Sequence, residues 1–172
     1  MQRPHCIVFC TPPCIVTQRA AALFAVQYPK YTAIQLEDSL QLIRHARGLS
    51  IGEVLESPKY RSEAIGEFTA FLEAGLELGE SLILSGPFWS VPDRHLILDI
   101  IPNHYCLTAI TQIINTKDFF DFNRKHRRPE CHWPISELTK ILADFELPTT
   151  QEGFEEIHMI TEPMDIPYTV AA

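Results

Sequence analysis

The stretch HCIVFCTPPCIVTQRAAALF, residues 5–24, decides the fold because an apolar run, a proline-rich turn and a helical pattern follow one another in it. Residues 5–10 predict a short buried strand. Residues 18–28 place apolar side chains around a helical surface, and Pro29 predicts the end of that helix. A tight turn between a strand and a helix N-terminus is where many proteins bind phosphate groups, so residues 11–17 are the first candidate site.

The same succession of strand and helix recurs along the chain. Four further segments have strand patterns, at residues 31–36, 81–85, 107–114 and 155–160. Helical patterns separate them, and the clearest of these runs from about residue 59 to residue 77. This alternation predicts an α/β fold whose five strands form a mostly parallel sheet covered by helices on both faces. Ligands of such sheets bind at the carboxyl ends of the strands.

Helix starts are marked by polar residues and prolines. Ser50 and Glu53 have the spacing of a capping box. Ser90 is the expected N-cap of a helix that has a proline near its start. We expect Thr116 to cap a helix that runs to His126, and Pro134 to open a later helix that runs to about Glu146.

Composition places the chain among globular domains. Of its 172 residues, 46% are hydrophobic and 21% are charged, which predicts one domain over residues 1–161 with an irregular tail at 162–172. The net charge of -8 argues against nucleic-acid binding by the whole surface, although it leaves room for a local basic patch. No apolar run is long enough to span a bilayer, so no membrane contact is expected. The five cysteines suggest no disulfide framework, which favours a reducing, cytoplasmic location.

The cysteines are not expected to bind a metal ion. Cys6 and Cys10 would share one face of a strand at a separation of about 13 Å, which is too far for one ion. We therefore interpret them as small buried hydrophobic residues and predict no metal site.

Several longer stretches carry a resemblance to a known family. FNRKHRRPECHWPISELTKILADFELPTTQEGFEEIHMI resembles the lid and last strand of P-loop kinases related to the polynucleotide 5'-kinase domain and the zeta-toxin-like kinases. SLILSGPFWSVPDRHLILDI is similar to their third strand and its loop, and YTAIQLEDSL is similar to their second strand. The resemblance covers about residues 5–161. It implies a three-layer P-loop kinase-like fold with strand order 2-3-1-4-5 and a lid at about 124–134.

The phosphate loop departs from the pattern of that family, GxxxxGK(S/T). The chain reads CTPPCIVT, so that Cys10 and Ile15 replace the glycines and Val16 replaces the lysine. Only Thr17 keeps its type, at the position whose hydroxyl would meet Mg²⁺. Glycine lets successive N–H groups converge on a phosphate, and Ile15 is poorly suited to such a backbone. Gly86 also stands where the family usually has an acid after its third strand. The Walker A motif is therefore degenerate.

Two groups of residues match functional residues of the resembled kinases, and each also has a purely structural explanation. Arg124, Arg127 and Arg128 match lid arginines that clamp phosphates in the resembled kinases, but cations also suit the exposed C-terminal end of a helix. Glu37 matches the acid that accepts the proton of the acceptor hydroxyl in that family. In the plainer interpretation Asp38 or Ser39 caps the next helix.

The loop after the third strand offers a third set of candidates. Arg94 could contact a phosphate, or could belong with Asp93 to a capped first turn of a helix. Phe88 and Trp89 could stack on a base. Alternatively, they pack under the loop or contact a protein partner.

Three functions compete on these grounds. The first is a catalytically degenerate kinase-like protein, a pseudokinase, that needs no cofactor and binds a protein partner or an assembly of the phage type. The second is a divergent kinase that uses ATP and Mg²⁺, with Glu37 as catalytic base, to phosphorylate a nucleoside, a nucleotide or a polynucleotide 5'-hydroxyl. The third is nucleic-acid binding without chemistry, through the lid arginines and Trp89.

Overall fold

Five parallel strands form the centre of the molecule. The computed structural model describes residues 3–12, 24, 26, 28–112, 115–126 and 128–160. The strands are β1 (His5–Cys10), β2 (Tyr31–Gln35), β3 (Ser81–Ser85), β4 (Cys106–Thr111) and β5 (Glu156–Met159). Their spatial order is β2-β3-β1-β4-β5, and every neighbouring pair is parallel. This confirms the predicted fold class and the predicted strand order.

β1 is the central strand. Cys6 lies opposite Leu82 of β3 and Leu107 of β4, and Cys10 lies opposite Thr111 at the far end of β4. All five residues from Cys6 to Cys10 are fully buried, as the apolar run predicts. The turn that follows β1 therefore leaves the sheet from its most buried strand.

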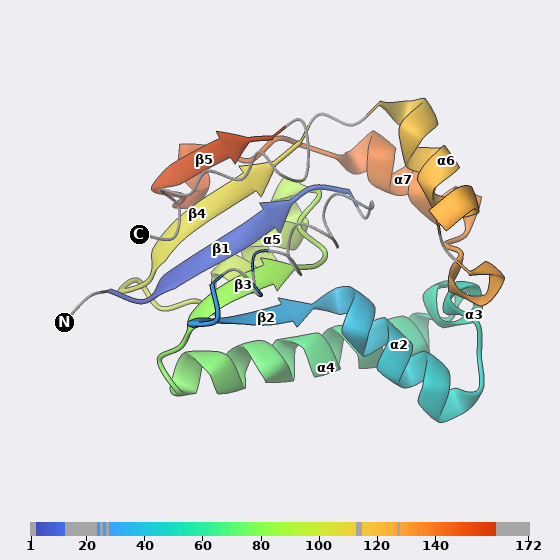
Figure 1. The fold of residues 1–172 in the computed structure, drawn as a ribbon, viewed down its shortest axis with the longest axis horizontal. Helices are drawn as coiled ribbons and strands as arrows, with labels where there is room; N and C mark the ends of the chain where they lie inside the picture. Colours follow the sequence, from blue (N-terminus) through green and yellow to red (C-terminus); the bar gives the residue numbers. More distant parts are fainter. Residues whose placement is uncertain are drawn as a thin grey trace.

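Helices connect the strands. They are α2 (Leu36–Arg47), α3 (Ile51–Glu56), α4 (Pro58–Glu77), α5 (Val91–Leu98), α6 (Thr116–His126) and α7 (Ile135–Asp144), with short 3-10 turns at Pro129–Cys131 and Thr150–Glu152. In Figure 1, α4 runs along one side of the sheet beneath β2, while α6 and α7 lie beyond the arrowheads of the strands. Of the helix predicted at 18–28, only Phe24 and Val26 are described as helical.

The two faces of the sheet have separate cores. On one face, Cys6, Val8 and Leu84 pack with residues of all six helices named above. On the other face, Ile7 and Phe9 pack with Phe24, Tyr31 and Ile160, among others. Right-handed crossovers explain this division, because only the connection from β1 to β2 crosses the second face.

The observed helix starts agree only partly with those predicted from the sequence. Ser50 and Glu53 form the predicted capping box, and Ser90 is the N-cap of α5. The predicted cap at Asp38 or Ser39 is wrong, because α2 begins at Leu36, directly after β2, and its N-cap Gln35 makes no side-chain capping hydrogen bond. Thr116 is not a cap either. The Asn115 side-chain oxygen instead accepts a hydrogen bond from the Lys117 amide (2.9 Å).

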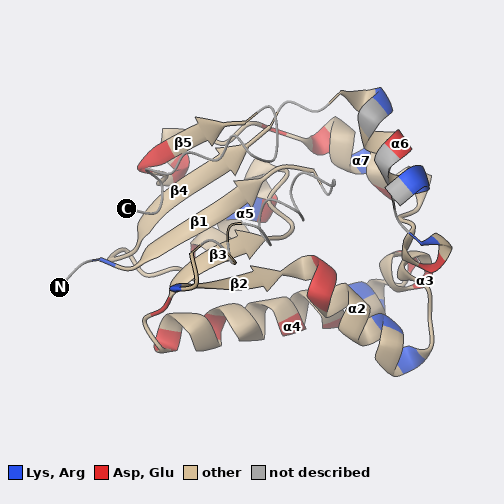
Figure 2. Ribbon diagram, in the orientation of Figure 1, with Lys and Arg blue, Asp and Glu red and all other residues tan. Residues whose placement is uncertain are grey.

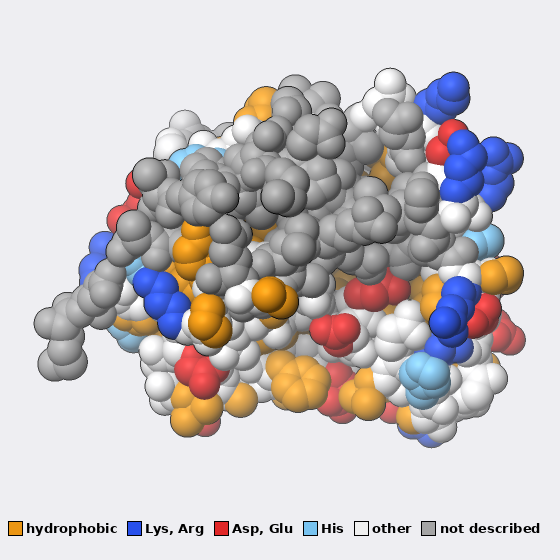
Figure 3. Space-filling model, in the orientation of Figure 1, with side chains coloured by type: hydrophobic (Ala, Val, Ile, Leu, Met, Phe, Trp, Pro, Cys, Tyr) orange, Lys and Arg blue, Asp and Glu red, His pale blue; other side chains and the backbone are white. Residues whose placement is uncertain are grey.

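The surface gathers many of its basic side chains at one end of the molecule. Figure 2 shows Lys and Arg gathered around α2, α3 and α6, beyond the ends of the strands. Apolar side chains are exposed over α4, including Phe71 and Leu78, and Figure 3 shows orange side chains along the same margin. In the described part of the chain, no helix combines the length and the apolar character needed to cross a membrane.

Candidate functional site

The turn after β1 leaves the sheet at a closely packed point. Cys10 is the last residue of the strand, and its carbonyl oxygen accepts a hydrogen bond from the Thr111 hydroxyl (2.8 Å). Burial raises the pKa of the Cys10 thiol well above its ordinary value, so the group is a neutral packing residue at pH 7. Residues 13–23, which include Ile15, Val16 and Thr17, lie outside the described residues. The predicted burial of Ile15 or Val16 therefore stays a prediction.

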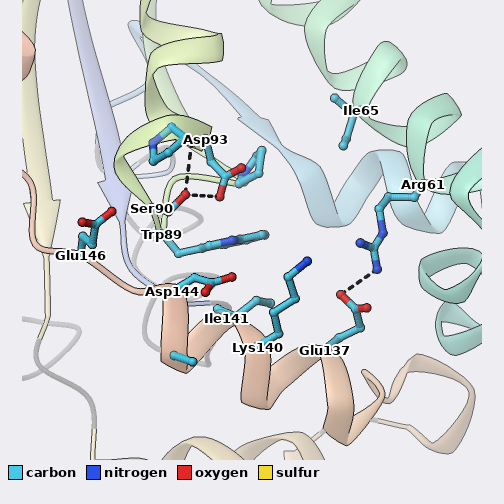
Figure 4. Close-up of a pocket in the computed structure, with 13 residues that line it drawn as sticks. Arg61, Ile65, Trp89, Ser90, Asp93, Glu137, Lys140, Ile141, Asp144 and Glu146 are labelled. Carbon is cyan, nitrogen blue, oxygen red and sulfur yellow. Dashed lines mark hydrogen bonds and ion pairs between the residues drawn. The ribbon is translucent and has the colours of Figure 1, made fainter.

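A cavity of about 560 Å³ opens beside the carboxyl end of β3 (Figure 4). We call it the α4–α7 cavity, because its walls are the start of α4, the loop and helix start at residues 87–93, and α7 with the residues that follow it. Arg61 and Ile65 project from α4, Trp89 lies across the middle, and Lys140 and Ile141 come from α7. It lies at the edge of the sheet where α/β proteins bind their ligands.

Acidic groups outnumber basic groups in this cavity. Its carboxylates are Asp93, Glu137, Asp144 and Glu146, and its cations are Arg61 and Lys140. Arg61 and Glu137 neutralise each other in an ion pair of 2.6 Å. The remaining three carboxylates face one ammonium group. The cavity therefore disfavours a polyanion such as a nucleoside triphosphate, because the net field repels it.

Two of these carboxylates serve the start of α5. Asp93 accepts a hydrogen bond from the Ser90 hydroxyl, and the Asp93 amide donates to the Ser90 oxygen (3.3 Å). The Val91 amide donates to Oε2 of Glu146 (3.0 Å). The predicted capped turn is thus confirmed for Asp93. The part of Glu146 in the same turn was not predicted, because Glu146 is distant in sequence.

Gly86 is enclosed by aromatic rings. A Cβ atom built there would lie 3.1 Å from Cζ of Phe68 and 3.2 Å from Cε2 of Phe88. The two rings pack edge to face with their centroids 6.1 Å apart. A carboxylate side chain, which the resembled kinases usually carry here, does not fit unless the rings move.

Arg94 is a structural residue. Its side chain has no exposed surface, and Nε lies 2.6 Å from Oε2 of Glu152. Nη2 donates to Oε1 of the same carboxylate (3.1 Å), and Nη1 donates to the carbonyls of Phe88 (3.1 Å) and Glu146 (2.8 Å). The prediction that Arg94 contacts a phosphate is therefore wrong in this structure, because its donors are already used inside the protein.

Glu152 completes this internal pair. Burial acts to raise the pKa of Glu152, but hydrogen bonds from Arg94 and from the Thr149 amide outweigh it and leave the pKa below its ordinary value. The T-x-x-E spacing of Thr149 and Glu152 is visible in the sequence and predicts a capping box, which the structure contains. No sequence signal pairs Glu152 with Arg94, which lies 58 residues earlier.

The two aromatic candidates have different positions. Phe88 is fully buried, so the prediction that it stacks on a base is wrong and the alternative, packing under the loop, is confirmed. Trp89 is only partly buried. Its ring meets Trp133 edge to face at 6.4 Å and lines the α4–α7 cavity, where it stays available to a ligand.

Three further site candidates, Glu37, Arg124 and Arg128, lie apart from the cavity. Glu37 is half-buried in the first turn of α2, where its Oε1 accepts a hydrogen bond from Gln41 (3.4 Å). Arg124 is 75% exposed and pairs with Asp121 at 3.3 Å, and Arg128 is also exposed. Arg127 lies outside the described residues. None of the three described residues Glu37, Arg124 and Arg128 lines the α4–α7 cavity.

Asn123 ties the end of α6 to the start of α7. Its side chain is buried, and its Nδ2 donates to the Trp133 carbonyl (3.0 Å), while the Trp133 amide donates to its Oδ1 (2.9 Å). These two hydrogen bonds join the end of α6 to the residue before Pro134. Within the described ranges, no group of three or more metal-ligating side chains is close enough to hold an ion.

The order of the sheet and the helices that flank it define the fold class of the molecule. A parallel sheet of this order, flanked by helices, is the fold of the P-loop kinases. A provisionally assigned kinase from Chloroflexus aurantiacus J-10-fl is similar over 96% of this chain and 93% of its own, with a TM-score of 0.65 and 16% identity. A gluconokinase from Sinorhizobium meliloti 1021 is similar over 99% and 89% of the two chains, with a TM-score of 0.55 and 13% identity.

A third similar structure is a shikimate kinase from Aquifex aeolicus VF5. It matches over 96% of this chain and 91% of its own, with a TM-score of 0.53 and 13% identity. No protein-family model matches the chain, and no curated protein matches its sequence. At these identities the likeness concerns the fold alone.

Proposed function

We propose that this chain keeps the fold of a P-loop kinase without its phosphoryl transfer and works as a binding module for a protein partner. The observation that carries the proposal is the sequence of the turn after β1. Cys10, Ile15 and Val16 stand there in place of two glycines and the lysine. A helix N-terminus alone contributes about 0.3–1 kcal/mol to anion binding at an exposed site, which does not replace a lysine and a ring of N–H donors.

Three features of the described residues support this proposal. The acid that the resembled kinases usually carry at position 86 would have to displace the rings of Phe68 and Phe88. Arg94 is held inside the protein by Glu152. The α4–α7 cavity has an excess of carboxylates. These features, with the sequence of the turn after β1, favour a module that does not use Mg-ATP.

Calorimetry with Mg-ATP tests this proposal directly. We expect no binding heat at millimolar nucleotide from a chain whose folded state is confirmed by circular dichroism. Micromolar affinity would overturn the proposal. Glu37→Gln serves as the control variant in this calorimetry. It removes the candidate base and leaves the turn after β1 unchanged, so it should give the same result as the wild type.

A divergent kinase is the second candidate, and the position of Glu37 favours it. Glu37 follows β2 at the carboxyl end of the sheet, beside Asp38, whose pKa is raised by burial and by the Glu37 carboxylate. Labelled ATP with 5'-hydroxyl oligonucleotides or nucleosides is the assay for this candidate. Transfer that Glu37→Gln abolishes would establish the kinase, and no transfer to any of these acceptors would count against it.

Binding of nucleic acid without chemistry is the third candidate. Arg124 and Arg128 are exposed beyond the ends of the strands, and Lys125 lies beside them. Gel-shift binding that weakens with salt, and weakens further in an Arg124→Ala variant, would favour it over a protein partner. Absence of a shift at low salt would exclude it.

A further inference from the structure

β2 forms one edge of the sheet. Among the described residues it pairs only with β3, so the backbone groups along its other side face no strand. An edge of this kind accepts an additional strand readily, and proteins usually cover or charge it. Here the strand itself, YTAIQ, carries no charged side chain.

Helix α4 continues past this edge with an apolar stripe. Phe71 is 53% exposed and Leu78 is 75% exposed, and Ala74 lies between them on the same side of the helix. Gly75 holds the helix close to the sheet, since a Cβ atom there would lie 2.9 Å from Cδ2 of Leu82. The stripe and β2 line the same groove, and no strand of the described part of the chain pairs with this side of β2. In Figure 1, α4 runs beneath β2 at the margin of the molecule.

A groove of about 360 Å³ runs between β2 and this stripe. Its walls are residues 32–35 of the strand and the stripe on α4, and its charged groups are Asp38 and Glu80. Glu80 lies near the start of β2, because Ser81 pairs with Tyr31, and Asp38 lies beyond the strand's end. Of the residues that the structure describes, no lysine, arginine or histidine lines the groove.

We propose that this β2–α4 groove binds an extended peptide segment of a partner protein, which adds to the sheet as a sixth strand beside β2. The stripe from Phe71 to Leu78 spans about 10 Å along the helix. That length matches about three residues of a strand, so two side chains on one face of the peptide would cover it. The peptide therefore carries apolar residues at alternate positions and lysine or arginine toward its ends.

A second copy of the chain fits the groove less well. Antiparallel pairing of two β2 edges would place the acidic ends of the two grooves against each other, and each chain has a net charge of -8. A basic peptide instead brings its cations to Asp38 and Glu80. The proposal rests on the part of the proposed function that assigns a protein partner, and it names the site for that partner. The site does not involve the turn after β1, so binding of ATP there would overturn the loss of phosphoryl transfer and leave this groove untouched.

Selection of displayed ten-residue random peptides on the folded chain tests the proposal. We expect the selected peptides to alternate apolar residues and to carry lysine or arginine. Ala74→Arg, at an exposed position in the groove, should weaken their binding at least tenfold. Ala70→Arg is the matched control, because Ala70 is exposed on the same helix but does not line the groove, and it should leave binding unchanged.

Hydrogen exchange identifies the mode of binding. A selected peptide should slow the exchange of backbone amides in Tyr31–Gln35, because new inter-strand hydrogen bonds form there. Failure to select peptides, equal binding to Ala74→Arg, or unchanged exchange in β2 would each overturn the proposal. A dimer in sedimentation experiments that Ala74→Arg dissolves would also overturn it, since the occupant would then be a second copy.

Discussion

Replacing Arg94 with methionine should destabilise the protein more than any exposed substitution. Methionine fills much of the same space but removes every donor of the guanidinium. The Glu152 side chain is only 4% exposed and would keep its charge with hydrogen bonds from Thr149 alone. Three carbonyl groups, those of Phe88, Glu146 and Leu147, would also lose a donor.

The expected cost follows from the buried charge. Removing one partner of a buried ion pair typically costs 3–5 kcal/mol, because the other charge is left unpaired in the interior. Domains of this size are stable by only about 5–15 kcal/mol. We therefore expect Arg94→Met to lose about 3–5 kcal/mol of its free energy of unfolding, which is at least about a fifth of a typical total.

Urea denaturation at pH 7 measures this loss. Arg94→Met combined with Glu152→Met should be more stable than Arg94→Met alone, because no charge is left buried. Arg128→Met is the exposed control and should stay within about 0.5 kcal/mol of the wild type. If Arg94→Met loses less than about 1 kcal/mol, or if the second substitution lowers stability further, the structural role assigned to Arg94 is refuted.

Three other outcomes are expected. Gly86→Asp should cost about 1–3 kcal/mol in urea denaturation, because the phenylalanine rings around it must move, and no loss would mean that the site is open. The depressed pKa of Glu152 gives a stability that is full above its ordinary value of 4.5 and is lost as the pH falls through the folded-state pKa. Glu152→Gln should therefore flatten the acid limb of a pH–stability curve, and an unchanged limb would contradict this. Val16→Lys alone should not restore ATP binding in calorimetry, since Ile15 and Pro13 still interrupt the ring of N–H donors. Tight binding by that variant would show that charge alone was missing.

The sequence predicts the sheet well because the features that mark each strand lie within a few residues of one another along the chain. Each strand is a short apolar run bounded by turn residues, and the alternation with helices leaves few topologies open. The capping box at Ser50 and Glu53 and the N-cap at Ser90 were predictable for the same reason, since a cap depends on residues three positions apart.

Helix boundaries were harder to predict where polar residues lie next to one another. Asn115 and Thr116 are both good caps, and only the path of the chain out of β4 decides between them. Near Asp38 the prediction failed for another reason. β2 passes into α2 without a loop, so the helix begins two residues before the first candidate cap.

The sequence predicted where the candidate site lies, but it did not predict which side chains would be available there to a ligand. The loop after β3 does lie at the ligand end of the sheet, yet the burial of Arg94 and Phe88 depends on Glu152 and Phe68. Both partners are distant in sequence, and no periodicity signals such a pairing. The acidic character of the α4–α7 cavity likewise arises only when α7 is placed against α4.

The bond between Asn123 and Trp133 has a consequence for how often the lid-like segment can open. Opening would break two buried hydrogen bonds, each worth about 1 kcal/mol, and would expose an indole ring whose burial contributes about 2 kcal/mol. A gap of about 4 kcal/mol corresponds to an open population of about one molecule in a thousand. The end of α6 is therefore held against the start of α7 nearly all of the time, and Trp133 keeps a steady edge-to-face contact with Trp89, which lines the α4–α7 cavity.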